Sequence, residues 1–431
     1  MVFGSTVGIG ILRLPGTVAA QLGSAWLVLA VWAAGGVYTL LAASSVAELA
    51  AMLPQAGGFY VYARRAFGVP VGFSVGWGDW LNNCTVLAMG SFAAAEYLAV
   101  LVSRFAGHER TVALVLLAAL TVLHWMGLRL SSIVLQLSSS ATALTLIALA
   151  VACLFHPGTA NSALHQPLSS APISVVTIFA ALIVALRAVV VTYDGWYEAI
   201  YFAEEDKDPA HNLPRSILGG VLVIVALYLL MNLAFLAVMP MTELAASKLP
   251  AANAAQIVFG STWLAQRSGE FVTLLSLLTL ISLVNSVMLG APRILFAVAR
   301  DGLFPEKVSD VSATGTPRPA LFLSSLAAVI LVANGSLERI VTVTSFMVAS
   351  VYCMNYVALF VLRRREPELQ RPFHAWGYPW GTALVLIGSV LFLAAAVHED
   401  RGDALRALLL LAISVPVYFV FRQFRNTSTS A

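Results

Sequence analysis

The sequence predicts an all-α integral membrane protein with about 12 transmembrane helices. Three observations lead to this prediction: a composition poor in charge, a succession of long apolar runs, and two glycine-interrupted stretches within such runs. Of the 431 residues, 60% are hydrophobic and only 10% are charged, whereas a soluble domain carries about 25% charged residues. Lipid must therefore cover most of the surface. The chain has neither an acidic nor a basic tail, and we expect no nucleic-acid partner.

A helix that crosses a bilayer needs about 20 mostly apolar residues, and the chain holds twelve such segments in one polytopic domain, 1–431. The runs at 69–102, 172–203 and 268–299 exceed the length of one span, so we expect tilted, broken or extended helices there. Besides the opening segment, the spans are predicted near 25–49, 69–102, 111–128, 133–155, 172–203, 216–239, 268–299, 319–334, 340–362, 380–397 and 404–424.

The basic residues indicate the orientation, because cytoplasmic loops are enriched in Lys and Arg. With the N-terminus inside, fifteen of the 24 basic residues fall in inner loops and seven in outer loops. An even number of spans places both termini on the same side. We therefore expect a protein of the cytoplasmic membrane with both termini in the cytoplasm.

Two segments predict breaks in the helical backbone at membrane depth: "GSTVGIG" at 4–10 and "VVTYDGWYEAIYFAEE" at 190–205. Non-helical backbone survives there only where protein buries it or where it lines a wet cavity. The breaks fall in spans one and six, which is the pattern of a five-plus-five inverted repeat with discontinuous helices 1 and 6. Ordinary helix-packing glycines are the alternative. The predicted parts are repeat one at about 1–155, repeat two at about 172–363, and two extra helices, 11 and 12, at about 380–424.

Five stretches then show a family resemblance. They are "GSTVGIGILRLPG" at the start, "VAELAAMLPQAGGFYVYARRAFG" at 46–68, "YDGW" followed by "AEEDKDPAHNLPRSI" at 203–217, "APRILFAVARDGLFP" at 291–305 and "RPFHAWGYPW" at 371–380. In this order and at these spans the chain resembles the amino acid–polyamine–organocation (APC) superfamily of transporters, in particular its L-amino-acid-transporter-like branch.

The resemblance implies alternating access and an amino acid as the small-molecule substrate. The substrate carboxylate would meet backbone N–H groups at the first break, and its ammonium would meet backbone carbonyls at the second. The physics agrees, because the N-terminus of a half-helix favours an anion and exposed carbonyls favour a cation. The implied substrate-binding residues are Ser5, Thr6, Gly8, Ile9 and Gly10 in the first span, Val191, Tyr193, Asp194, Gly195, Trp196 and Glu198 in the sixth, and Ser282 and Asn285 in the eighth.

Three positions depart from the pattern of the superfamily. Ile9 stands where relatives usually have Ser, Ala or Cys, which narrows the site. Val191 stands where several relatives place a gating Phe, so Tyr193 or Trp196 would have to close the pathway. Thr142 stands where many relatives have a Lys. A hydroxyl cluster around Thr142 could ligate Na⁺ instead, or its members could bond back to the preceding helical turn. The cluster is Ser138, Ser139, Ser140 and Thr142.

Asp194 is the most specific functional prediction from the sequence. A charged side chain at membrane depth costs free energy unless it pairs with another group or contacts water. Asp194 could contact the substrate ammonium or bind a proton; it could also cap the following half-helix or pair with Arg187. Glu198 lies one turn further along and adds to the case for a proton pathway. Coupling to a proton or to Na⁺ stays open. At the inner end of the sixth span, Glu204 and Glu205 are predicted to form a gating salt-bridge network with Arg293 and Arg300.

Other polar residues are interpreted as structural. Asp79, Asn82 and Asn83 are predicted to hold helices together. We find no nucleophile–base pair and no metal-ligand spacing at membrane depth, so no catalytic residue, metal site or cofactor is predicted and an enzyme is disfavoured. An amine or polyamine carrier remains as an alternative, since Asp194 and Glu198 could hold a second positive group. The oligomeric state is left open.

The beginning of the chain carries one more expectation. Relatives have a cytoplasmic tail and a half-helix before the first break, whereas only residues 1–3 precede Gly4 here. We therefore expect either a natural start upstream of Met1 or a poorly gated, transport-defective protein.

Overall fold

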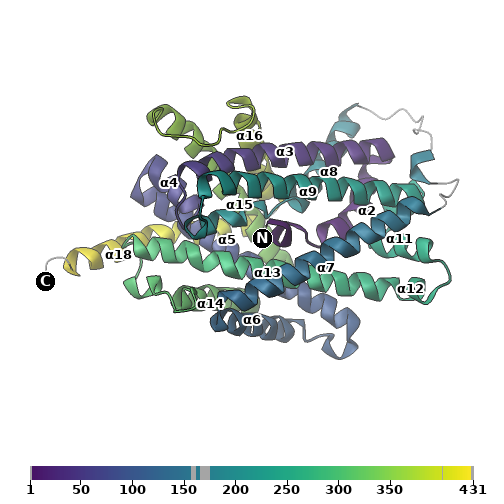
Figure 1. The fold of residues 1–431 in the computed structure, drawn as a ribbon, viewed down its shortest axis with the longest axis horizontal. Coiled ribbons are helices and arrows are strands. Elements are labelled where there is room, and N and C mark those ends of the chain that lie inside the picture. Colours follow the sequence, from purple (N-terminus) through teal and green to yellow (C-terminus); the bar gives the residue numbers. More distant parts are fainter. Residues whose placement is uncertain (1, 157–161, 166–174, 400, 429–431) are drawn as a thin grey trace.

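The computed structural model describes residues 2–156, 162–165, 175–399 and 401–428, and within them every regular element is a helix. The predicted first residues of repeat two, 172–174, lie outside this part of the chain. Figure 1 shows most of the long helices running side by side along one direction, with α7 crossing them obliquely. The all-α prediction is confirmed.

Nine helical segments in the described residues are long and apolar enough to cross a membrane. The other three predicted spans do not meet that criterion as single helices: the first and sixth are interrupted, and α14 (Arg318–Asn334) is only 17 residues long. The nine segments are α3 (Ala25–Met52), α5 (Val69–Leu101), α6 (Glu109–Met126), α7 (Leu128–Phe155), α9 (Pro209–Val238), α13 (Ser268–Arg300), α15 (Leu337–Arg365), α16 (Trp380–Glu399), and α17 (Arg401–Ala412) with the start of α18 (Ser414–Ser428).

The remaining elements connect the long helices. They include α4 (Phe59–Phe67), which leads from α3 into α5, and α10 (Met241–Ala246), α11 (Pro250–Phe259) and α12 (Trp263–Gln266), which link α9 to α13. The short 3₁₀ turns are η1 (Ser103–Phe105), η2 (Ala163–His165) and η4 (Glu306–Ser309).

The first predicted break is present. Helix α1 (Val2–Thr6) ends before Val7, and α2 (Gly10–Leu22) begins after Ile9. The intervening backbone passes through Gly8, the residue with the least helical preference in this stretch.

The second predicted break is also present, at residues 193–195, between α8 (Val175–Thr192) and η3 (Trp196–Glu205). Gly195 has a φ of 102°, in the left-handed region that favours glycine. The segment after the break differs from the α-helix that the resemblance implied, because η3 is a ten-residue 3₁₀-helix. A 3₁₀-helix rises about 2.0 Å per residue, so it covers more depth than an α-helix of the same length.

The three apolar runs that exceed the length of one span form different structures. The run at 172–203 is broken, whereas α5 and α13 are single uninterrupted helices of 33 residues each. At 1.5 Å per residue, each is about 50 Å long, more than the hydrocarbon core of a bilayer requires. The two helices pack against each other more extensively than any other pair.

Helices from the two halves of the chain pack against each other in pairs. In addition to α5 with α13, the contacts join α3 to α9, α6 to α14, and the two broken helices to each other, α1 on η3 and α2 on α8. These are the partners expected if spans one to four correspond to spans six to nine. The boundaries of the two repeats remain a prediction.

Candidate functional site

The two backbone breaks lie against each other. The Ser5 hydroxyl on α1 donates to the backbone carbonyl of Gly195 at 2.8 Å, and also lies 3.2 Å from the carbonyl of Val2. A side chain at position 195 would overlap the Ser5 backbone carbonyl, so the glycine is needed for the close approach as well as for its positive φ. Segments that are far apart in the sequence therefore form one junction.

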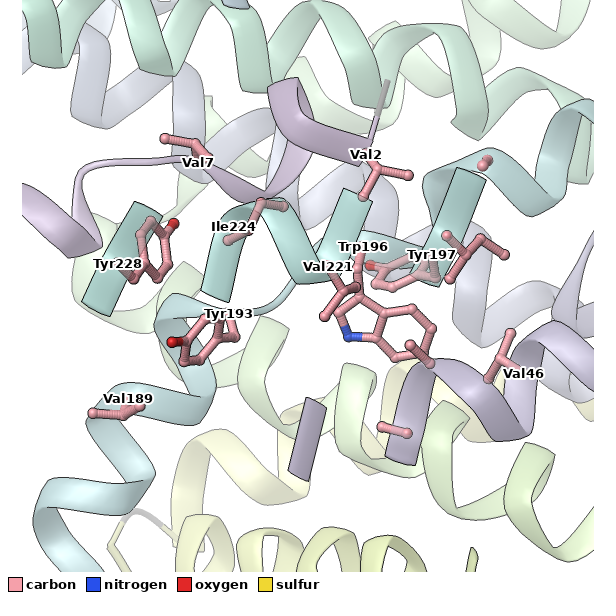
Figure 2. Packing of buried hydrophobic residues seen from close by; sticks show 14 of the residues in the cluster. Val2, Val7, Val46, Val189, Tyr193, Trp196, Tyr197, Val221, Ile224 and Tyr228 are labelled. Atoms are coloured by element: carbon pink, nitrogen blue, oxygen red, sulfur yellow. The ribbon is translucent and has the colours of Figure 1, made fainter. Parts of the chain in front are cut away.

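Tyr228 on α9 ties the same two segments together from the other side. Its hydroxyl lies 3.1 Å from the carbonyl oxygen of Thr6 and 3.3 Å from that of Thr192. These carbonyls belong to the last residues of α1 and α8, which have no partner within their own helices. Figure 2 shows Tyr228 beside Tyr193, whose ring centroid lies 5.0 Å from that of Tyr228. The sequence interpretation missed Tyr228, and its only signal was a lone tyrosine in span seven.

The residues of the first break differ in exposure. Ser5 and Thr6 are 4% exposed, and the Thr6 hydroxyl oxygen has no hydrogen-bond partner among the described residues. Gly8, Ile9 and Gly10 are half-buried. Ile9 occupies the N-cap of α2 and its side chain makes no cap bond. The Leu12 N–H bonds back to the Ile9 carbonyl at 3.1 Å, so the N–H groups of Gly10 and Ile11 are the ones without an acceptor in the preceding helical turn.

Asp194 accepts a short hydrogen bond from the Tyr352 hydroxyl on α15. The Trp196 ring stacks on Tyr352, with centroids 5.9 Å apart and planes at 17°. Gly195 fills the N-cap of η3 without a side-chain cap bond, and the Arg187 guanidinium lies over the ring of Phe392. The Asp194 carboxyl therefore contacts Tyr352, which the sequence interpretation also missed, and the backbone N–H of Gly195 at the start of η3.

Tyr193 and Trp196, the two candidates for closing the pathway, point to different places in the structure. Tyr193 turns away from the breaks, since its hydroxyl donates to the Trp32 carbonyl on α3 at 3.2 Å. Trp196 stays at the second break with Tyr352. Val191 is 48% exposed, while the next two residues are buried.

The predicted residues of the fifth and eighth spans form a wall beside α1. The Ser139 and Ser282 hydroxyls are 3.0 Å apart, joining α7 to α13. Ser138 bonds back to the Leu135 carbonyl, as the structural alternative expected, whereas the buried Thr142 hydroxyl has no partner among the described residues. Asn285 donates to the Ser131 carbonyl on α7 at 2.8 Å, which holds helices together.

Glu198 does not join the breaks. It is 1% exposed and faces α13, where an added side chain at Gly290 would overlap its Oε2 atom. Its Oε2 has no hydrogen-bond partner among the described residues. Glu198 thus belongs to a separate polar cluster behind the second break.

The expected ion pairs are present at the end of η3. Arg293 donates to Glu205 at 2.6 Å, and Arg300 pairs with Glu204 at 2.7 Å. The Arg300 guanidinium lowers the pKa of the Glu204 carboxyl below its usual value. Each pair joins η3 to α13, and their role as a gate remains a prediction.

A second ionic cluster closes the same end of the bundle. Glu48 on α3 is fully buried and accepts from Arg363 on α15 at 2.8 Å and 2.5 Å. Arg371 lies 3.4 Å from it, and the backbone N–H of Ala375 donates to it at 2.7 Å. Arg64 on α4 pairs with Asp301 directly after α13.

Comparison with known families assigns the fold to a group of transporters. The amino acid permease family matches residues 1–419. The chain belongs to the amino acid permease family. It is therefore an integral membrane protein of the APC superfamily, as the resemblance implied.

Curated relatives of the same family cover almost the whole chain. The serine/threonine exchanger SteT of Bacillus subtilis (strain 168) is 26% identical over 425 residues, which are 97% of this chain and 94% of SteT. The b(0,+)-type amino acid transporter 1 of Mus musculus is 27% identical over 439 residues, 99% of this chain and 86% of that protein. The Asc-type amino acid transporter 1 of Mus musculus is 27% identical over 378 residues, 86% of this chain and 70% of that protein.

Proposed function

We propose that this protein is a secondary transporter of L-amino acids in the cytoplasmic membrane, working by alternating access as an exchanger or a proton symporter. The observation that carries the proposal is the junction of the two backbone breaks through Ser5 and Gly195. The family supports transport, and the name of the serine/threonine exchanger supports exchange over symport. We infer a carrier rather than an enzyme on the same grounds.

The junction offers complementary groups to a zwitterion. The uncapped start of α2 presents N–H groups that suit the substrate carboxylate. The carbonyls of Thr6, Thr192 and Gly195 suit its ammonium, and in this structure they accept from the hydroxyls of Tyr228 and Ser5. A bound ammonium would replace these hydroxyl donors, so substrate binding would rearrange the contact between the broken helices.

The ionic contacts of η3 supply an inner gate. Glu204 and Glu205 bind Arg300 and Arg293 on α13, and both pairs hold the second broken helix against the long helix behind it. Since the same broken segment carries Gly195, motion at the substrate junction is transmitted directly to these pairs. We propose that they separate when the site opens toward the cytoplasm, the side on which both termini lie.

Transport by purified protein in liposomes tests the proposal. Labelled neutral, cationic and anionic L-amino acids are offered with and without internal amino acid, with and without Na⁺, and across an imposed pH gradient. Uptake that requires internal amino acid identifies exchange, and uptake driven by an inside-alkaline gradient identifies proton symport. No uptake from the full panel would reject the proposal, and competition by putrescine but not by leucine or alanine would select the amine carrier instead.

A further inference from the structure

A pair of buried carboxylates lies behind the second break, outside the proposed substrate junction. Asp79 on α5 is fully buried and Glu198 on η3 is 1% exposed. The Tyr201 hydroxyl lies 2.8 Å and 3.0 Å from the two carboxylate oxygens of Asp79. Tyr201 and Glu198 also face the same point on α13, Gly290, so the two acids share one neighbourhood.

This neighbourhood holds more acceptors than donors. The Asn83 amide nitrogen donates toward Asp79, and the Asn82 amide nitrogen donates toward the Tyr197 hydroxyl at 3.4 Å. The oxygens Glu198 Oε2, Asn82 Oδ1 and Asn83 Oδ1 are buried without a hydrogen-bond partner among the described residues. A buried oxygen without a donor is costly, and a buried carboxylate more so. Such a set of oxygens is complementary to a cation.

Four arginines on or directly after α4, α13 and α15 are engaged elsewhere. Arg293 on α13, one turn after Gly290, binds Glu205 and the Leu289 carbonyl. Arg64 on α4 pairs with Asp301. Arg363 and Arg371 bind Glu48 of α3. The titratable groups within electrostatic range of the pair are Asp194 on the second break, Tyr62 on α4, and Tyr197 and Tyr201 on η3.

Gly290 provides the room for Glu198. A Cβ at this position would overlap Glu198 Oε2 and would lie 2.9 Å from Cδ2 of Tyr201. Glycine in a helix interior is destabilising by about 1 kcal/mol relative to Ala, so its presence in α13 needs a compensating role. Here it lets the carboxylate of Glu198 lie against the α13 backbone.

We propose that Asp79 and Glu198, with the amide oxygens of Asn82 and Asn83, form a site for a monovalent cation, H⁺ or Na⁺. One such cation lowers the charge of the acid pair from −2 to −1, and the remaining repulsion is small enough for η3 to stay packed against α13. When it leaves, repulsion between the carboxylates favours release of η3, the segment that also carries Glu204 and Glu205. Coupling of this site to amino acid movement rests on the proposed function, whereas cation binding itself does not.

Thermal unfolding of the purified full-length protein in detergent, without amino acid, tests cation binding independently of transport. Melting temperature is measured from pH 5 to 9 with choline chloride or NaCl as the salt. A rise with NaCl identifies Na⁺, and a rise with falling pH in choline chloride identifies H⁺. In Glu198→Gln and in Asp79→Asn, the change of melting temperature with that cation is expected to shrink to less than one third of its wild-type size.

Glu96→Gln is the matched control, because Glu96 lies on α5 like Asp79 but is exposed, and this variant is expected to retain the wild-type response. Gly290→Ala is a second test variant if the carboxylate variants fold poorly. By displacing Glu198, it should shift the Na⁺ or H⁺ concentration at the midpoint of the melting-temperature response at least tenfold. A wild-type melting temperature that responds to neither cation, or a Glu198→Gln response equal to the wild type, would overturn the proposal. In liposomes, uptake that persists in Glu198→Gln but loses its ion dependence would link the site to transport.

Discussion

Ser5 and Gly195 are 190 positions apart in the sequence, yet the hydroxyl of one donates to the carbonyl of the other at 2.8 Å. The bond joins the two breaks of the helical backbone directly. It satisfies, from within the protein, a carbonyl that the proposed substrate ammonium would otherwise use.

Replacing Ser5 by Ala removes the donor to Gly195. The expected loss is about 1 kcal/mol of stability in the substrate-free protein, the usual net value of one hydrogen bond. Added substrate should restore more stability to this variant than to the wild type, because its ammonium can donate to the freed carbonyl. Melting temperatures with and without substrate measure both effects. Ser345→Ala, which removes a bond within one helix only, is the control.

Replacing Gly195 by Ala should abolish transport. The residue has a φ of 102°, and an added Cβ would overlap the Ser5 backbone, which cannot move as a flexible side chain can. Initial uptake rates in liposomes provide the measurement. Gly219→Ala is the matched control, because a Cβ there meets no atom within 4 Å and should stabilise α9 by about 1 kcal/mol. Wild-type uptake by Gly195→Ala would show that the junction is not needed.

Replacing Tyr352 by Phe removes the donor to Asp194 while keeping the ring that stacks on Trp196. A hydrogen bond to a charged group is worth about 1.5–3 kcal/mol, so we expect uptake to fall at least about tenfold. Asp194→Asn keeps an acceptor for Tyr352 but removes the charge, and we expect a larger loss if Asp194 holds the ammonium.

The pH profile of Asp194→Asn separates the roles of Asp194. If the variant keeps the pH dependence of the wild type, the proton-site hypothesis for Asp194 is rejected. Tyr38→Phe is the control for Tyr352→Phe, because it also removes a tyrosine hydroxyl; Tyr38 on α3 is partly buried and donates to the Val385 carbonyl. Uptake in Tyr38→Phe should stay close to the wild type.

Replacing Glu48 by Gln should destabilise the whole helix bundle. The fully buried carboxylate faces two arginines, and removing it leaves their charges uncompensated at a cost of about 3–5 kcal/mol. Glu366→Gln, which removes one partner of the exposed pair with Arg65, should cost less than about 1 kcal/mol. Melting temperature and the yield of monodisperse protein measure the difference, and equal effects of the two variants would contradict the prediction.

The Glu204–Arg300 pair predicts a pH window for the inner gate. Because the folded-state pKa of Glu204 is lowered, its contribution is present above the unfolded pKa of about 4.3 and is lost as the pH falls through the lower folded value. Both side chains are more than one third exposed, so the pair contributes about 0.5 kcal/mol at most. The melting-temperature difference between wild type and Glu204→Gln should be constant from pH 6 to 8 and vanish on acidification below pH 4. A difference that grows on acidification would contradict it.

The overall fold could be predicted because its signals are local. Hydropathy and charge identify membrane helices, and Gly8 and Gly195 mark the breaks because glycine tolerates the backbone that a break requires. The ion pairs of Glu204 and Glu205 were predictable from the same logic, since charges at a helix end must find partners. The predicted span at 319–334 agrees with α14 to within one residue.

The contacts of the site were less predictable. Tyr228 and Tyr352 lie on helices α9 and α15, and no spacing in the sequence says that their hydroxyls reach the two breaks. Glu198 is one turn from Asp194 along the chain, but the 3₁₀ geometry of η3 turns it toward Gly290 rather than toward the junction. Asp79, interpreted as a packing residue, faces the same cluster through Tyr201.

The sequence by itself therefore determined that lipid is the solvent of this protein, the order of its apolar segments, and the places where the helical backbone is interrupted. These properties follow from residue-by-residue preferences for lipid and for helix. Only the tertiary structure decided which hydroxyls satisfy the freed carbonyls, which way Glu198 and Tyr193 turn, and which acids meet. Such contacts join residues across different helices, and their geometry follows from helix packing rather than from any local preference.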